Sequence, residues 1–174
     1  HLSLRRQRQM CIRDRYTTIR RHEPTITMMK QMGFDLYAMG NHEFDAGSSE
    51  LLRVIYGGNN PDTGKYFPGA LAPVSQDDPL YDASLPTSGM KADICANVVY
   101  KQGDPKAGET LFDPYYVQIF QAEDGTEVKV GFIGILYRNM KESVYAEGTA
   151  TIETTDEAEA INRYTAELHA QGVN

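Results

Sequence analysis

The sequence has few cysteines, no long apolar run and, after its first residues, little positive charge. Its two cysteines, Cys11 and Cys95, are too few for a disulfide framework and do not form a metal-ligand pair. Cys95 lies in an apolar stretch, where a buried and inert thiol is expected. No apolar run approaches the roughly 20 residues that a membrane-spanning helix needs, so no span is predicted. These shortages argue against a disulfide scaffold, a cysteine metal site and a helical membrane protein.

Charge is distributed unevenly along the chain. Residues 1–22 contain seven arginines and one acid, a net charge of +6, whereas the whole chain carries −7. The remaining 152 residues therefore carry −13. A nucleic-acid-binding domain needs a basic face on its fold. The acidic body consequently argues against nucleic acid as a partner.

The basic start, residues 1–21, is separate from the predicted fold. It could be an arginine-rich arm for nucleic acid or a membrane surface, a transit peptide, or a disordered tail without a role. A fourth interpretation is that it is not native, because residues 4–15 resemble translated sequencing-adapter sequence. We favour this last interpretation and expect the folded domain to occupy residues 22–174.

After the tail, helix and strand patterns alternate, which predicts a layered α/β fold. Helices are predicted over Glu23–Met32, from Ser48 or Ser49 to about Ile55, and from a capping box of Thr154 and Glu157 to Gly172, with Ala158, Ile161, Tyr164 and Leu168 on the inner face. Strands are predicted over residues 34–39, 94–99, 115–121 and 127–136. The Asp124-Gly125 pair predicts a hairpin between the last two strands, and the apolar run that ends the last one predicts central burial.

Residues 57–91 differ from the rest of the chain. They contain five of the eight prolines and several glycines, a composition that is typical of a long irregular segment. We predict a surface insertion here, a tolerated decoration rather than a substrate lid. Its aspartates, Asp62, Asp77, Asp78 and Asp82, are then expected to be solvated charges.

Gly40-Asn41-His42-Glu43-Phe44-Asp45 is the one segment whose residue types indicate chemistry. The amide oxygen of Asn41 is a hard, neutral ligand suited to a divalent cation. His42 can carry a positive charge near neutral pH, and Asp45, three residues on, can reach its imidazole and fix the tautomer. A charged imidazole beside a phosphate would stabilise the transition state or protonate the leaving group. From the residue types alone, ordinary turn chemistry is an equal alternative.

The surrounding sequence resembles a known family. Residues 33–47 are similar to the calcineurin-like metallophosphoesterase signature in its 5′-nucleotidase form, a Gly-Phe-Asp strand followed by Gly-Asn-His-Glu-Phe-Asp. Residues 95–98, 112–115 and 128–135 resemble the family's later strands in the same order, so the resemblance covers about 22–174. It implies part of a four-layer α/β sandwich, with mixed sheets flanked by helices. It also implies that Asn41 is a metal ligand, His42 the catalytic histidine and Asp45 its paired carboxylate.

The resemblance implies a reaction as well. It indicates phosphoester hydrolysis with two divalent metal ions, which could be zinc, manganese, cobalt, magnesium or calcium. The expected substrate is a small-molecule nucleotide, a nucleoside 5′-monophosphate. A 2′,3′-cyclic-nucleotide phosphodiesterase is the runner-up, and a noncatalytic binding module that has lost its metals is the alternative of another class. The parent protein is expected to have a C-terminal nucleoside-binding domain and a periplasmic, cell-surface or secreted location.

The sequence also departs from the family pattern. The family's earlier Asp-x-His and Gly-Asp motifs do not occur before Asn41, and its later His-x-His would lie beyond Asn174. We therefore expect the 174-residue chain to be an incomplete catalytic domain, inactive by itself. The remaining histidines, His1, His22 and His169, are weak site candidates. The tyrosines expected to pack in or beside the core are Tyr115, Tyr116, Tyr137 and Tyr164.

Overall fold

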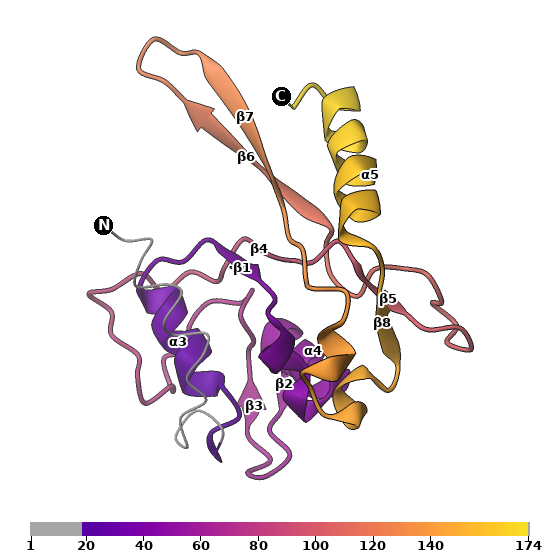
Figure 1. Cartoon of the computed structure of the whole chain (residues 1–174). Coiled ribbons are helices and arrows are strands. Elements are labelled where there is room, and N and C mark those ends of the chain that lie inside the picture. Colours follow the sequence, from indigo (N-terminus) through magenta and orange to yellow (C-terminus); the bar gives the residue numbers. More distant parts are fainter. Residues whose placement is uncertain (1–18, 174) are drawn as a thin grey trace. The chain divides into compact units, whose positions relative to one another are not determined.

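In the computed structural model, which describes residues 19–173, the chain forms two compact units. Unit 1 comprises residues 19–36 and Ala46–Lys91, and unit 2 comprises Tyr37–Asp45 and residues 92–173. Most of the predicted basic tail, with His1 and Cys11, lies outside the described residues. Helices and short strands occur together along the chain, as the α/β class requires (Figure 1). No helix in the described part is long and apolar enough to cross a membrane.

Unit 1 contains two helices, α3 (Glu23–Gln31) and α4 (Ser48–Tyr56). The first confirms the prediction, with Pro24 in its first turn. The predicted serine cap of the second is wrong, because α4 begins from Gly47, which has φ 92° and offers no side-chain cap. A positive φ of this kind is favourable for glycine and strained for serine, so the helix starts one residue earlier than the serine rule suggests.

Residues 57–91 are mostly irregular, as predicted, but they are more than a surface decoration. Their only strands are β2 (Gly58–Asn59) and β3 (Tyr66–Phe67), which pair antiparallel. The segment supplies several buried apolar side chains to unit 1, namely Phe67, Ala70, Val74 and Met90. Phe67, Ala70 and Val74 have helical spacing, but Pro68 and Pro73 lie among them and no helix forms, so periodicity does not account for their burial. Most of the segment is exposed or half-buried, as expected of a surface insertion, but its buried residues also make it part of the core of unit 1.

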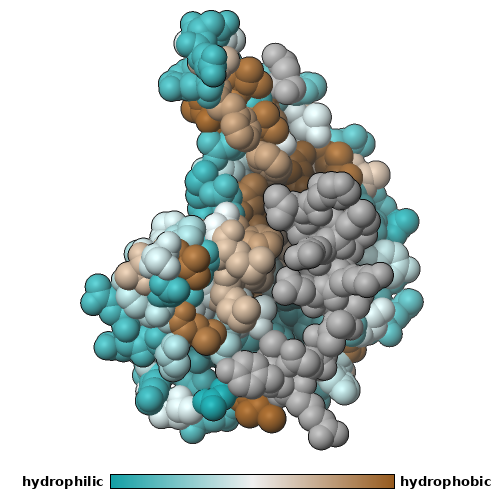
Figure 2. Space-filling model, turned by 90° about the vertical axis from the view of Figure 1, so that its left-hand side faces the viewer, coloured by the Kyte–Doolittle hydropathy of each residue, from teal (hydrophilic) through white to brown (hydrophobic). Residues whose placement is uncertain are grey.

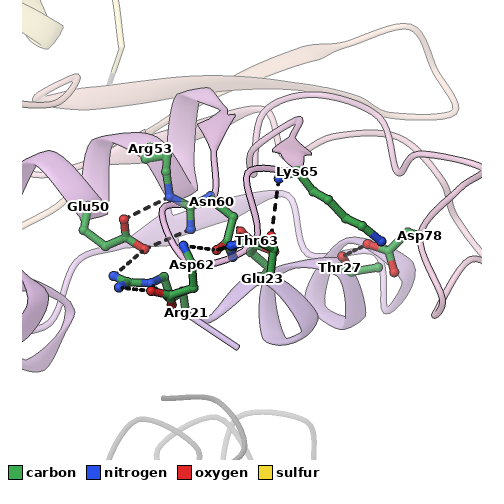
Figure 3. A network of polar contacts seen from close by, with 10 residues as sticks. All are labelled: Arg21, Glu23, Thr27, Glu50, Arg53, Asn60, Asp62, Thr63, Lys65 and Asp78. Carbon is green, nitrogen blue, oxygen red and sulfur yellow. Dashed lines mark hydrogen bonds and ion pairs between the residues drawn. The ribbon is translucent and has the colours of Figure 1, made fainter. Parts of the chain in front are cut away.

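A network of charged side chains ties this segment to the two helices (Figure 3). Arg53 donates to Glu50 at 2.9 Å and to Glu23 at 2.7 Å, and its side chain is only 10% exposed. Asn60 donates to the same Glu23 oxygen at 2.9 Å. At the edge of the network Asp62 pairs with Arg21. The aspartate that was expected to be a solvated charge is thus an ion-pair partner.

Further side chains of α3 form hydrogen bonds with the irregular segment. The ammonium of Lys30, which is 2% exposed, donates to the backbone oxygens of Gly69 at 2.7 Å and Ala72 at 2.9 Å. Thr27 donates to Asp78 at 2.8 Å, so this aspartate is also a structural acceptor. Polar side chains of α3 therefore satisfy backbone and carboxylate groups that a loop of this length would otherwise leave to water.

Unit 2 contains most of the strands, and every described sheet has two of them. The pairs are β1 (Leu36–Ala38) with β4 (Ala92–Ile94), β5 (Val98–Tyr100) with β8 (Ile152–Thr154), and β6 (Tyr115–Gln121) with β7 (Glu127–Ile133). The predicted strand over residues 94–99 is thus divided in two, and β8 was not predicted. The connector between β4 and β5 contains Cys95, which is fully buried, as predicted. Burial raises the pKa of its thiol to about 12.

Asn97 explains why the predicted strand is interrupted. Its side chain is fully buried and donates to the backbone oxygens of Leu136 at 2.6 Å and Thr155 at 3.2 Å. Its own amide oxygen accepts from the Leu136 N–H at 2.8 Å. A buried amide can satisfy several backbone groups at once, so the connector binds two distant segments instead of continuing a ladder.

The hairpin of β6 and β7 confirms the Asp-Gly prediction. Gly125 has φ 85° and the Ala122 N–H donates to the Thr126 oxygen at 2.8 Å. The start of the second strand is exposed, with Val128 51% exposed, whereas the apolar run at its end, Ile133–Leu136, is half-buried or buried. Figure 2 shows apolar residues at the surface of the hairpin, just below its hydrophilic tip. One face of β7 packs on a helix at Gly131 and Leu168, whereas Phe132 on the other face is exposed.

That helix is α5 (Glu157–Ala170), which lies beside the hairpin (Figure 1). Asp156 caps it by accepting from two backbone N–H groups, so the predicted capping box is wrong, and Thr154 ends β8 instead. The buried residues of the helix are Ala160, Tyr164 and Leu168, whereas the predicted inner-face residue Ile161 is exposed. Tyr164 packs on Tyr115 with ring centroids 5.9 Å apart. Tyr137, predicted to pack, is instead 57% exposed.

Candidate active site

The candidate motif follows β1 in unit 2 and forms a short 3-10 helix, η1 (Asn41–Ala46), rather than the irregular loop that was predicted. A 3-10 helix has three residues per turn, so positions three apart lie on the same side. His42 and Asp45 have this spacing, and the imidazole Nδ1 lies 3.0 Å from the carboxylate Oδ2. The structure therefore brings together the two residues that the sequence predicted as a pair.

The two side chains differ sharply in exposure. The side chain of Asp45 is only 4% exposed, whereas that of His42 is 52% exposed. The carboxylate thus lies inside the unit and the ring extends outward from it. With Nδ1 directed at Asp45, the neutral ring is the Nδ1–H tautomer. Its other nitrogen, Nε2, is then left for a molecule that approaches from solvent.

Asn41 starts η1 and is half-buried, one residue before the exposed histidine. Its amide oxygen has the chemistry of a ligand for a hard divalent cation. No group of three or more His, Cys, Asp or Glu side chains within residues 19–173 is arranged to hold a metal ion. These residues therefore do not by themselves fit a two-metal centre, and Asn41 is the one candidate ligand from the motif.

The weak histidine candidates do not change this result. His22 is half-buried just before α3 in unit 1, and His169 is exposed in the last turn of α5. Gly103 and Asp104 form a Gly-Asp pair after the motif, but Asp104 accepts from the backbone N–H of Lys106 at 2.8 Å in an exposed turn. We therefore assign none of these side chains to the candidate site.

Two apolar contacts that the sequence did not reveal hold the inner side of the motif. Phe44 is fully buried and meets Phe112 edge-on, with ring centroids 6.4 Å apart. Gly148, in the 3-10 helix η3 (Ala146–Thr149), approaches the Phe44 backbone so closely that an added Cβ would lie 2.2 Å from its oxygen. Only glycine fits this approach, because real Cβ atoms do not come so near. Neither Phe112 nor Gly148 lies near the motif in sequence.

A polar contact holds the other inward residue of the motif. The hydroxyl of Tyr37, on β1, donates to Glu43 Oε1 at 3.1 Å. Burial, together with the charge of Glu43 and this hydrogen bond, raises the pKa of Tyr37 well above its ordinary value. The hydroxyl is therefore a neutral donor throughout the physiological range. No sequence rule predicts a contact between a strand tyrosine and a glutamate six residues later.

Comparison with known proteins shows which proteins this chain is similar to. No protein-family model matches the sequence. The chain is 37% identical over 152 residues to endonuclease YhcR of Bacillus subtilis, and 38% identical over 152 residues to the cell wall protein Lmo0130 of Listeria monocytogenes. It is also 28% identical over 160 residues to a probable 5′-nucleotidase of Treponema pallidum. These alignments cover 87%, 87% and 91% of this chain but only 10%, 17% and 20% of the relatives.

Solved structures are similar to this chain in fold. The calcineurin-like phosphoesterase YfkN of Bacillus subtilis matches 92% of this chain with a TM-score of 0.56 and 20% identity. The NAD nucleotidase NadN of Haemophilus influenzae matches 91% with a TM-score of 0.55 and 21% identity. The chain therefore has the fold of the calcineurin-like phosphoesterases and is similar in sequence to a probable 5′-nucleotidase. It spans 39% and 24% of those two structures.

These similarities confirm the resemblance stated from the sequence and the α/β fold of metallophosphoesterase type. They support a phosphoester hydrolase family. Because the chain spans a fifth or less of its three longest-aligned curated relatives, the activity of any whole relative is not thereby its own. The roles of His42, Asp45 and Asn41 remain proposals that rest on the geometry described above.

Proposed function

We propose that this chain carries one part of a metallophosphoesterase active site that hydrolyses nucleoside 5′-monophosphates to nucleoside and phosphate. The observation that carries the proposal is the bond from the exposed His42 ring to the buried Asp45 carboxylate at 3.0 Å. The relatives named 5′-nucleotidase and NAD nucleotidase support nucleotides as the substrate class. A small molecule can reach the outward edge of this ring without any rearrangement of the buried carboxylate.

His42 would act on the phosphate through Nε2. In its protonated form the ring donates to a phosphate oxygen or to the ribose O5′ as the bond between O5′ and phosphorus breaks. The proton then leaves with the nucleoside. Asp45 accepts from Nδ1 throughout, which holds the ring orientation and stabilises the imidazolium through a carboxylate that is only 4% exposed. The buried carboxylate thus compensates for charge that the exposed ring must carry.

Asn41 is proposed to give its amide oxygen to one of two divalent metal ions. When bound, such ions hold a phosphate and provide a hydroxide near neutral pH. The other ligands would come from outside residues 19–173, a view that the much greater length of the relatives supports. Zinc, manganese, cobalt, magnesium and calcium all remain open as the native metals.

Phosphodiester hydrolysis is the second candidate, because the Bacillus subtilis relative at 37% identity is named an endonuclease. A 2′,3′-cyclic-nucleotide phosphodiesterase would use the same His42 chemistry on a diester. The Listeria monocytogenes relative is named a cell wall protein, which supports a cell-surface or secreted location for the parent protein. A noncatalytic binding module would keep the fold and show neither reaction.

The test is an assay of the protein as its gene encodes it, with AMP, 2′,3′-cyclic AMP and bis-p-nitrophenyl phosphate as substrates. His42→Ala should lower kcat by about 10²–10⁴-fold, the usual contribution of a general acid. His169→Ala is the matched control, because that histidine is exposed at the end of α5, and it should leave kcat unchanged. The ratio of monoester to diester turnover separates the two candidate reactions.

Full activity in the His42→Ala protein would rule out the proposed role of His42. Absence of activity toward all three substrates, with metal present, would favour the binding module. The purified 174-residue chain by itself is expected to show no metal-dependent phosphatase activity. Turnover by that chain would mean that its own residues complete the site.

A further inference from the structure

The segment from Tyr37 to Glu43 is closed at its base by one hydrogen bond. Tyr37 lies on β1 and Glu43 within η1, and the hydroxyl and the carboxylate meet at 3.1 Å. Asn41 and His42 lie between these two residues in the chain. Their backbone is therefore part of a loop that this contact closes, although neither side chain takes part in it.

We propose that Tyr37 and Glu43 are positioning residues that fix the backbone on which Asn41 and His42 are presented. The inference rests on the proposed function, since it assigns these two residues a role in the same site. Glu43 directly follows His42, so holding its carboxylate limits the rotation of the peptide that carries the imidazole. This restraint differs from that of Asp45, which acts on the ring itself.

The chemistry of the contact suits a fixed restraint. The pKa of Tyr37 is raised well above its ordinary value, so its hydroxyl keeps the proton that it donates. A neutral donor to a carboxylate forms a charge-assisted hydrogen bond, which is stronger than one between two neutral groups. Both side chains are half-buried, so water competes only in part. The bond therefore persists over the pH range in which His42 would act.

The surrounding contacts show where this restraint acts. After Glu43 the motif is anchored by Phe44 against Phe112 and by Gly148 against the Phe44 oxygen. Before it, β1 ends at Ala38 and only Met39 and Gly40 lead to Asn41. Met39, which is 4% exposed, anchors the chain before Asn41 by burial, and the Tyr37–Glu43 hydrogen bond adds a polar restraint between Met39 and Phe44.

The test uses nitrogen-15 NMR of the His42 ring in the full 174-residue chain, with the signal assigned by His42→Gln. Tyr37→Phe removes the hydroxyl and should shift the ring toward a mixture of Nδ1–H and Nε2–H tautomers. Tyr145→Phe is the matched control, because it removes a hydroxyl that is 65% exposed in the same unit, and it should leave the His42 signal unchanged. Glu43→Gln keeps an oxygen acceptor and should preserve most of the wild-type signal, whereas Glu43→Ala should reproduce the effect of Tyr37→Phe.

An unchanged His42 signal in a folded Tyr37→Phe chain would overturn the inference. If that variant loses its dispersed amide spectrum, the two Glu43 variants decide, and identical His42 signals in Glu43→Ala and Glu43→Gln would overturn it. The double variant Tyr37→Phe/Glu43→Ala should be no more altered than either single one if the two residues act as a pair. Because the readout does not use turnover, its failure is distinguishable from failure of the proposed phosphatase activity.

Discussion

Each of the two units of this chain is stabilised internally, and the kind of interaction differs between them. In unit 1, Arg53 bridges Glu23 and Glu50 while Lys30 reaches backbone oxygens of the irregular segment. In unit 2, neutral contacts are prominent, above all the Asn97 amide and the packing around Phe44. The candidate catalytic pair belongs to unit 2. The clustered charges of unit 1 therefore have a structural role, whereas the exposed histidine of unit 2 is the candidate for a catalytic role.

The largest predicted effect is in unit 2. Asn97→Ala would leave the Leu136 N–H and O and the Thr155 oxygen without their side-chain partner. A buried polar group left unsatisfied costs about 1–3 kcal/mol, so we expect a loss of roughly 4 kcal/mol in the free energy of unfolding. Urea denaturation followed by circular dichroism measures this loss.

A control variant and a residue-resolved measurement test the difference between the two units. Asn162→Ala removes the same side chain from an exposed position of α5 and should change stability little. Amide hydrogen exchange in Asn97→Ala should accelerate mainly in unit 2. Equal acceleration in both units would show that they unfold as one, and that the contrast between them has no energetic meaning.

The next largest effect is in unit 1. Arg53→Met keeps much of the apolar stem but leaves Glu23 and Glu50 without the cation, at a position where the arginine side chain is 10% exposed. Removing one partner of a buried ion pair costs about 3–5 kcal/mol, and we expect roughly 3 because both carboxylates are partly exposed. Thermal and urea unfolding measure the effect.

Asp62→Asn provides the matched contrast in the same network. Its pair with Arg21 lies at the exposed edge, and such pairs contribute little because water and salt screen them. We expect no measurable change in stability. A loss as large as that of Arg53→Met would mean that the network acts as one unit and not through its buried centre.

The sequence was informative where a local rule applies. The helix after Pro24, the Asp-Gly hairpin and the His42–Asp45 spacing all follow from contacts within a few residues, and the structure shows each of them. Local rules were wrong where a stronger neighbour competes. Asp156 displaces Thr154 as a cap because its carboxylate accepts from two N–H groups.

The remainder could not be predicted because it depends on long-range contacts. From the sequence, Asn97 is predicted to be a strand residue, because its contacts with Leu136 and Thr155 form only in the folded chain. Gly148 looks like any loop glycine until the Phe44 oxygen fills the space of its missing side chain. The positioning pair of Tyr37 and Glu43 spans only six residues, yet it depends on where β1 ends and η1 begins.

The third predicted effect, smaller than those of Asn97→Ala and Arg53→Met, concerns pH and unit 1. Burial lowers the pKa of Lys30 to about 8, against about 10.4 for an unfolded lysine. Between these values the unfolded chain binds more protons than the folded one, so stability rises with pH in this window. We expect the lysine to add roughly 2 kcal/mol to the free energy of unfolding between pH 7.5 and 10. Urea denaturation at a series of pH values measures the slope.

Lys30→Met isolates this contribution, because it keeps a stem of similar length and has no proton to lose. Its stability should lack the rise above pH 8 that the wild-type chain shows, while Lys65→Met, an exposed lysine of the same unit, should retain it. The ammonium is buried without an ion-pair partner at hydrogen-bond distance and instead donates to two carbonyl groups. Carbonyl dipoles compensate a buried charge less fully than a carboxylate does. If the slope persists in Lys30→Met, then the carbonyl groups of Gly69 and Ala72 stabilise the ammonium as well as water does, and the cost of charge burial in unit 1 lies elsewhere.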